Sequence, residues 1–398
     1  MHRQSQRTLL PALALAALTT MSVSPAAGQD TVGVIADRGR ANPPRAPFVH
    51  VFDPGTMQIT ASIPLPILPF ASVFDVEIAP DLGEAYVSDF DNNQLWVIDL
   101  RTSPPSLASG INPIPVTGPA PEDLALTTDG RYLLVSTGNT LASAGGTGSS
   151  LSVVDVRTRT EVSTVNFAPN CPIAVETSPD GSVLVSEMIA ATPTFHNTNV
   201  RRFRIDRRGT LTDTGDVVGI SALPGVQNLL VPNYPWLPGK INALLAQHTV
   251  HVSRPAGQTM GSLRTRGLTV AQSVTLDYPT GIDLCFDSLR SILYVRSNEL
   301  GSSGGAGVGN SKIDGYLFLP FTGQFGERIV SIPLERRAGT AFGVEQTALD
   351  PLARRLFVSG LAGPEVRVFD SLTGARVGTI SHPDFLWGVG INLRRRGW

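Results

Sequence analysis

Lysine, cysteine and long apolar runs are scarce in this 398-residue sequence. Lys240 and Lys312 are the exceptions among mostly arginine basic residues, and 31 basic residues nearly balance 33 acidic ones. Nucleic-acid binding usually needs a concentrated basic patch, which the sequence lacks, so we expect no nucleic-acid partner. Beyond residue 28 there is no stretch of about 20 apolar residues, so we expect no membrane span in the mature chain.

The first 28 residues have the layout of a secretory signal peptide. Arg3 and Arg7 precede an apolar run over 9–18, and small residues follow up to Gly28. The run is about half the length needed to span a bilayer. We predict a signal peptide over 1–28, export to the periplasm or the cell exterior, and a single domain over 29–398.

A short pattern recurs seven times after this leader: an apolar strand that ends in a small polar residue. Before most copies lie another apolar strand and a tight turn with Asp-Gly or Pro-Asp chemistry. After most copies comes a strand that alternates with period two, and several units add a fourth. The copies are VGVIAD (32–37), AYVSD (85–89), LLVST (133–137), VLVSE (183–187), ALLAQ (243–247), LYVRS (293–297) and LFVSG (356–360).

Each unit therefore predicts four short antiparallel strands, which at a period of roughly 40 to 60 residues describe a β-propeller blade. The N-terminal copy starts with no strand before it, and the C-terminal copy, GVGINLRRRGW, stops after one strand. We predict an all-β, seven-bladed propeller of four-stranded blades. It is closed by a composite blade, whose innermost strand is C-terminal and whose outer three strands are N-terminal. This closure removes an exposed strand edge.

The two cysteines, Cys171 and Cys285, fall in the same strand of the repeat, two units apart. A disulfide is possible in an exported chain, but it would have to cross the centre of the ring. We therefore expect two buried free thiols.

The repeat units resemble a known family. LALTTDGRYLLVST, VETSPDGSVLVSE and TALDPLARRLFVSGLAGPEVRVFDSLTGARVGTI resemble the YVTN repeat of exported bacterial propellers, a group related to lactonase-type propellers. The resemblance covers nearly the whole mature chain and implies the seven-bladed architecture. No catalytic motif of the lactonases matches residue by residue, so the resemblance implies no site.

Because strand direction alternates, the connections between blades share one face with the connections between second and third strands. We call this the top face, and long insertions fall on it. Aligning the innermost strands places one residue of each near the top of the channel. These residues are Asp75, Asp123, Ala174, Asn228, Asp283, Gln346 and Gly388. Trp387, at the start of the closing strand, and His196, in a top-face insertion, are further candidate ligand contacts.

Two interpretations of this oxygen-rich ring remain open. In one, Asp75, Asp123 and Asp283 hold Ca²⁺ or Mg²⁺, which prefer oxygen ligands, and Asn228 or Gln346 orients a substrate. In the other, the side chains accept hydrogen bonds from backbone amides of adjacent blades around a water-filled channel.

Three functions follow from these interpretations. The first is a binding or scaffold protein, expected to be a monomer, that holds a partner protein, peptide, glycan or small molecule at the top face. The alternative is a metal-assisted, lactonase-like hydrolase or lyase. A docking subunit of a redox complex is a third possibility, although no CxxCH motif is present. Fold alone does not choose among them.

Overall fold

The computed structural model describes the chain from Thr31 to Arg395 with internal gaps. The described ranges are 31–37, 40–41, 44–69, 71–79, 81, 83–138, 148–178, 180–188, 198–219, 226–230, 242–247, 259–264, 268–278, 280–298, 311–319, 323–334, 346–359, 365–382 and 390–395. The predicted signal peptide over 1–28, most of the top-face insertions, His196 and Trp387 lie outside them.

Every regular element of the described residues is a β-strand. The strands are β1 (Thr31–Asp37), β2 (Arg40–Ala41), β3 (Pro44–Arg45), β4 (Phe48–Asp53), β5 (Gln58–Pro64), β6 (Val73–Ile78), β7 (Glu84–Asp89), β8 (Gln94–Asp99), β9 (Ser106–Leu107), β10 (Ile114–Pro115), β11 (Pro121–Leu126), β12 (Tyr132–Thr137), β13 (Ser150–Asp155), β14 (Thr160–Asn166), β15 (Cys171–Thr177), β16 (Ser182–Met188), β17 (Thr198–Ile205), β18 (Leu211–Gly219), β19 (Val226–Leu230), β20 (Asn242–Gln247), β21 (Thr259–Arg264), β22 (Thr269–Thr275), β23 (Thr280–Asp287), β24 (Ile292–Asn298), β25 (Ser311–Leu319), β26 (Gln324–Leu334), β27 (Thr347–Asp350), β28 (Arg355–Val358), β29 (Glu365–Asp370), β30 (Arg376–Ser381) and β31 (Gly390–Arg395). The described residues include no helix with the length and apolarity that a membrane crossing requires.

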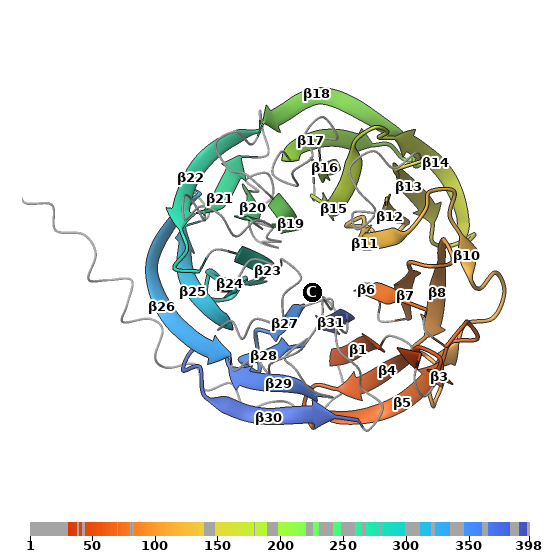
Figure 1. Ribbon diagram of the computed structural model, residues 1–398, viewed down its shortest axis with the longest axis horizontal. Helices are drawn as coiled ribbons and strands as arrows, with labels where there is room; N and C mark the ends of the chain where they lie inside the picture. Colours follow the sequence, from red (N-terminus) through yellow and green to blue (C-terminus); the bar gives the residue numbers. More distant parts are fainter. Residues whose placement is uncertain are drawn as a thin grey trace, which may run out of the picture.

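The strands form a ring of antiparallel sheets (Figure 1), which confirms the all-β propeller architecture. Six sheets have four strands, one has five, and β2 and β3 form a separate pair. The strand orders are β31-β1-β4-β5, β6-β7-β8-β10 with β9 also on β8, β11-β12-β13-β14, β15-β16-β17-β18, β19-β20-β21-β22, β23-β24-β25-β26 and β27-β28-β29-β30.

The prediction that every blade has four strands is wrong for the sheet that begins with β6. Its fourth strand is replaced by two short pieces, β9 and β10, which both pair with β8. The connecting segment, RTSPPSLASGINPIPVT (101–117), contains four prolines. Because proline has no backbone N–H, it interrupts the hydrogen-bonding ladder that a continuous outer strand would need.

The predicted closure of the ring is confirmed. β31 pairs antiparallel with β1, from Thr31 opposite Arg395 to Ala36 opposite Gly390, and β1 pairs with β4 on its other side. Figure 1 shows these first and last strands side by side. The final strand of the chain is therefore the innermost strand of the sheet that the N-terminal strands complete.

The apolar core lies between neighbouring sheets. One cluster joins Val34 and Val49 of the composite sheet to Val76 and Val87 of the next sheet, all of them buried. Further clusters of the described residues lie between other neighbouring sheets, and burial of this apolar area, at about 25 cal/mol per Å², stabilises the ring. Cys171 and Cys285 are both buried and unbridged, as predicted.

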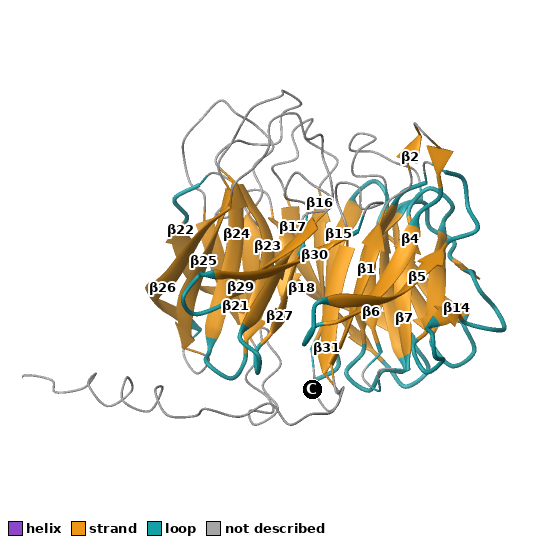
Figure 2. Cartoon of the chain, turned by 90° about the horizontal axis from the view of Figure 1, so that it is seen from below, coloured by secondary structure: helices purple, strands orange, loops and turns teal. Residues whose placement is uncertain are grey.

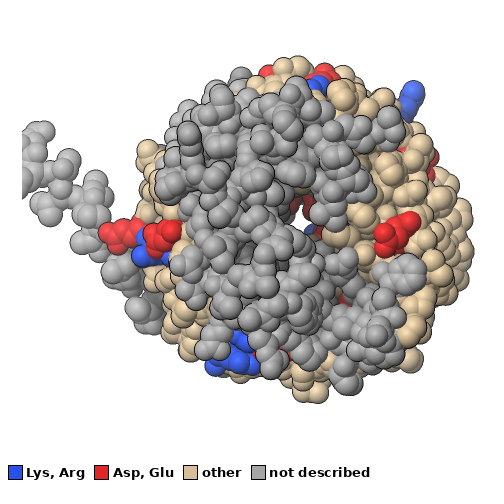
Figure 3. All heavy atoms as spheres, viewed as in Figure 1, with Lys and Arg blue, Asp and Glu red and all other residues tan. Residues whose placement is uncertain are grey.

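The ring has two distinct faces, seen edge-on in Figure 2. The innermost strands start at the top face and run to the opposite face, which we call the lower face. The turns between β6 and β7, between β11 and β12, and between β13 and β14 lie on that lower face. Figure 3 views the ring along its axis and shows acidic atoms inside the central opening.

Candidate functional site

The aspartates of the predicted ring connect one blade to the next. Asp75 Oδ2 accepts a hydrogen bond from the backbone N–H of Leu124 at 2.8 Å. Asp123 Oδ2 accepts one from the N–H of Val175 at 2.7 Å. In each case the donor lies on the innermost strand of the following sheet, one residue beyond the equivalent ring position. The aspartates therefore satisfy backbone groups that face the channel and have no partner within their own sheet.

The same pattern continues through the last blades. The Asp283 carboxylate accepts a hydrogen bond from the N–H of Thr347. Gln346 Oε1 accepts one from the N–H of Ile391 at 2.7 Å, and Gln346 Nε2 donates to Asp75 Oδ1 at 2.7 Å. Gln346 lies just before β27. Its side chain thus links β27 to the closing strand β31 and, beyond it, to β6.

Gly390, and not the predicted Gly388, occupies the ring position of the closing strand, because Ile391 supplies the equivalent backbone donor. A Cβ atom on Gly390 would lie 2.1 Å from the carbonyl oxygen of Phe74. The alignment was wrong by two residues because such a shift keeps every side chain on the same face of a strand, so alternation cannot detect it.

The small polar residue that ends many repeat copies has a structural role. Ser88 Oγ accepts a hydrogen bond from the N–H of Asp75 at 2.9 Å and donates to the carbonyl oxygen of Glu122 at 3.3 Å. Ser136 Oγ accepts one from the N–H of Asp123 at 3.1 Å. The pairing of the innermost strand shifts register at both aspartates. The serine therefore bonds the backbone where the ladder is interrupted.

The channel carboxyl groups have raised pKa values. Burial raises the pKa of Asp75, and burial together with the nearby Asp75 charge raises the pKa of Asp123 well above its usual range. Burial raises the pKa of Glu77 to about 7 and that of Asp283 to about 7. Burial and the Glu77 charge also raise the pKa of Glu176. Removal from water disfavours each charged form, and it outweighs the opposing effect of Arg394 on Glu77 and of Arg296 on Asp283.

The structure does not bring Asp75, Asp123 and Asp283 together as metal ligands. Among the described residues, no group of three or more His, Cys, Asp or Glu side chains is placed to hold a metal ion. Asn228 lies in β19, where the side chains are not described, and His196 and Trp387 lie outside the described residues. These three candidate contacts remain predictions.

A cavity of about 700 Å³ lies on the lower face, opposite the predicted site. It opens between the sheet of β6–β8 and the sheet of β11–β14. Its walls are turns at the ends of these strands and the proline-rich segment after β8. The lining residues are Ala79, Asp81, Glu84, Tyr86, Arg101, Ser109, Gly110, Ile111, Asp129, Gly130, Val156, Arg157, Thr158 and Arg159.

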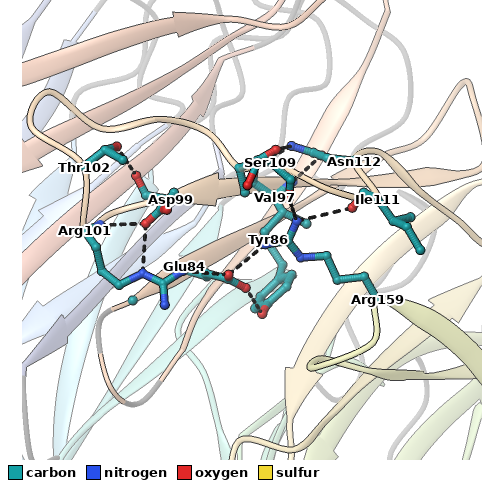
Figure 4. Close-up of polar contacts among 12 residues, drawn as sticks. Glu84, Tyr86, Val97, Asp99, Arg101, Thr102, Ser109, Ile111, Asn112 and Arg159 are labelled. Carbon is teal, nitrogen blue, oxygen red and sulfur yellow. Dashed lines mark hydrogen bonds and ion pairs between the residues drawn. The ribbon is translucent and has the colours of Figure 1, made fainter.

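A polar network centred on Glu84 forms one wall of this cavity (Figure 4). Glu84 Oε2 accepts a hydrogen bond from the Tyr86 hydroxyl at 2.7 Å. Glu84 Oε1 accepts bonds from Arg101 at 3.0 Å and from Arg159 at 2.8 Å. Arg159 also donates to the carbonyl oxygen of Ser109. One carboxylate therefore positions two guanidinium groups, one of which holds the segment after β8.

The third arginine of the cavity is not engaged in this way. Arg157 lies in the turn between β13 and β14, is exposed, and makes no hydrogen bond or ion pair with another described residue. The sequence prediction placed function on the top face and missed this cavity. Two local signals mark it: the proline-rich insertion at 101–117 and the Arg-Thr-Arg-Thr turn at 157–160.

Comparison with known proteins supports the fold alone. No family model matches the sequence, and no curated protein matches it. A functionally unknown protein from Desulfotomaculum acetoxidans is 20% identical, with a TM-score of 0.66 over 92% of this chain and 99% of that one. A putative 6-phosphogluconolactonase from Bacteroides fragilis is 14% identical, with a TM-score of 0.62 over 93% and 99%. The periplasmic gluconolactonase of Pseudomonas aeruginosa is 15% identical, with a TM-score of 0.61 over 88% and 96%.

Proposed function

We propose that this protein is an exported binding or scaffold propeller that holds its ligand at the top face. In this proposal the ring carboxylates fasten neighbouring blades and are not a metal centre. The observation that carries the proposal is the use of these side chains as acceptors for backbone amides of the next blade. The export signal predicted over 1–28 and the likeness to a periplasmic propeller support the location.

The ring carboxylates already use one or both of their oxygen atoms as hydrogen-bond acceptors. Asp75 uses Oδ2 for Leu124 and Oδ1 for Gln346. A calcium ion takes six to eight oxygen ligands, so at this site it would have to share these oxygens with the backbone donors.

The described part of the channel mouth offers surface for a ligand. Phe74 and Phe90 lie there with ring centroids 4.7 Å apart, and both are half-buried. Glu122 takes the position equivalent to Phe74 on the neighbouring innermost strand. Aromatic rings beside a carboxyl group suit a ligand with apolar faces and polar groups, such as a peptide or a glycan.

The second candidate remains a metal-assisted, lactonase-like hydrolase. It is favoured by the likeness of the fold to proteins described as gluconolactonases. In that case Asp75, Asp123 and Asp283 would have to bind a cation beside their backbone donors.

Elemental analysis of the mature protein, combined with thermal unfolding in calcium, magnesium and EDTA, separates the two candidates. The binding proposal expects no stoichiometric metal and no change in Tm. It also expects Phe74→Ala to weaken capture on a peptide or glycan array, whereas Leu352→Ala, on a lower-face turn, leaves capture unchanged. A bound divalent ion whose removal lowers Tm and abolishes lactone turnover would refute it.

A further inference from the structure

We propose that the lower-face cavity is a binding site for a small organic carboxylate. Arg157 and Arg101 would contact the carboxylate, and Ile111 and Val156 would contact an apolar body. This site is separate from the top face and does not depend on the proposed function. Its volume of about 700 Å³ falls within the range of roughly 300 to 1,000 Å³ that small-molecule pockets occupy.

The charges in the cavity favour an anion with a single charge. Arg159 is committed to Glu84 and to backbone carbonyl groups, and its side chain is only 13% exposed. Arg101 bonds both Glu84 and Asp99, but its side chain is 61% exposed. Arg157 is exposed and has no partner among the described residues. A planar guanidinium group without a partner suits a carboxylate, which it can bind through two parallel hydrogen bonds.

Acidic residues on the rim argue against a dianion. Asp81 and Asp129 both line the cavity and are exposed. The pKa of Asp129 is lowered by a hydrogen bond from the Thr127 hydroxyl, so this residue is charged at neutral pH. A phosphate with two charges would be repelled by these carboxylates, whereas one carboxylate can sit beside Arg157 at a smaller cost.

An apolar surface lies next to the arginines. Ile111 is 46% exposed, although it is a large aliphatic residue inside a concave site. A second cavity of about 320 Å³ also includes Ile111 and Arg159, so the concave surface continues along the edge of the sheet. Ion pairing with Glu84 explains why Arg101 and Arg159 lie in this cavity. It does not explain the exposed side chains of Ile111 and Arg157. An amphipathic acid would use both.

The segment that carries Ile111 is fixed in place. Asn112 Nδ2 donates to the carbonyl oxygen of Val97 at 2.8 Å, and Asn112 Oδ1 accepts from the N–H of Val97 at 3.0 Å. Arg159 donates to the carbonyl oxygen of Ser109 on the same segment. Figure 4 shows these contacts on either side of Ile111. A wall held in this way loses little entropy when a ligand binds.

Benzoate, benzyl alcohol and benzylamine test the proposal, because the three compounds share one ring and differ in charge. Calorimetric or NMR titration of the mature protein should show benzoate binding about tenfold or more tightly than the other two, as expected for a charged hydrogen bond. Arg157→Gln should remove that preference. Arg208→Gln is the matched control, because Arg208 lies in the equivalent turn of the next sheet and outside the cavity.

Four results would overturn the proposal. Equal binding of all three compounds would show an apolar patch without charge recognition. Absence of benzoate binding, or equal effects of Arg157→Gln and Arg208→Gln, would remove Arg157 from any site. Tighter binding of inorganic phosphate than of benzoate would contradict the preference for a single charge.

Discussion

The central channel and the lower-face cavity both contain carboxylates next to polar groups, but the hydrogen-bond partners and the pKa shifts of these carboxylates differ. In the channel, burial raises the pKa of Asp123 and Glu176 well above the usual range, and the partners are backbone amides. In the cavity, the partners of Glu84 are arginines, and the pKa of Asp129 is lowered. The number of carboxylates in a concave site therefore says little about its charge.

This difference separates structural from ligand-binding chemistry. A channel carboxyl group that accepts a hydrogen bond from a backbone amide fastens two blades, while its burial raises its pKa. A carboxylate that water and guanidinium groups can reach stays charged and leaves nearby cations in place for a ligand. The acidic ring that marks the channel in the sequence is, by this reasoning, part of the scaffold.

Adding one methyl group at the closing strand should have the largest effect on the channel. In Gly390→Ala the new Cβ atom would meet the backbone oxygen of Phe74, so the closing strand would have to shift. We expect a loss of about 3 kcal/mol or more in the free energy of unfolding, measured by urea denaturation. Gly326→Ala is the control, because its Cβ would meet only the Leu317 side chain at 3.3 Å. Equal effects of the two changes would argue against a tightly packed closure.

Removing a channel carboxylate should cost more than removing one from the cavity. Asp75→Ala leaves the N–H of Leu124 and the amide of Gln346 without their acceptor. We expect a loss of about 2 to 3 kcal/mol, because Leu124 is buried and its N–H would be left without an acceptor. Asp129→Ala, on the exposed rim of the cavity, should cost less than about 1 kcal/mol. If the two urea midpoints shift equally, the distinction between fastening and rim carboxylates is wrong.

The repeat pattern was enough to predict the architecture. Alternating apolar strands and Asp-Gly turns identified the sheets, and the incomplete units at both ends identified the closure through β31 and β1. Two details were beyond it. The pattern did not show that two short pieces in the proline-rich segment after β8 replace a fourth strand. It also placed Gly388, and not Gly390, at the ring position of the closing strand. Neither change alters which residues point to the core, which is all that the apolar pattern records.

The candidate site was less predictable than the fold. Aligning the innermost strands correctly grouped Asp75, Asp123, Asp283 and Gln346 at equivalent positions. Residue type alone could not tell a metal ligand from an acceptor of a backbone hydrogen bond. That choice depends on whether the next strand presents an unpaired amide, as Leu124 does to Asp75. The lower-face cavity combines turns from two sheets, and no single repeat unit contains its pattern.

The pH dependence of stability should report the channel carboxyl groups. The pKa of Glu77 is about 7 in the folded protein against an ordinary value of 4.5, so the folded state binds this proton more tightly. Its contribution is full below about pH 4.5 and is lost as pH rises through 7. Glu77→Gln, which keeps an acceptor for Asn392, should flatten the decline in Tm over this interval. A decline as steep as in the unmodified protein would place the effect elsewhere.

A change at Glu84, the centre of the cavity network, should have the smallest effect on stability. Its effect on ligand binding should be measurable. Glu84→Gln removes the charge shared by Arg101 and Arg159 but keeps an acceptor for the Tyr86 hydroxyl. Partly exposed ion pairs contribute little, so we expect a loss of about 1 kcal/mol or less, which shrinks further at high salt. With one negative charge fewer, the cavity should bind benzoate several-fold more tightly in calorimetric titration. Unchanged or weaker benzoate binding would show that Glu84 orients the arginines more than it competes for them.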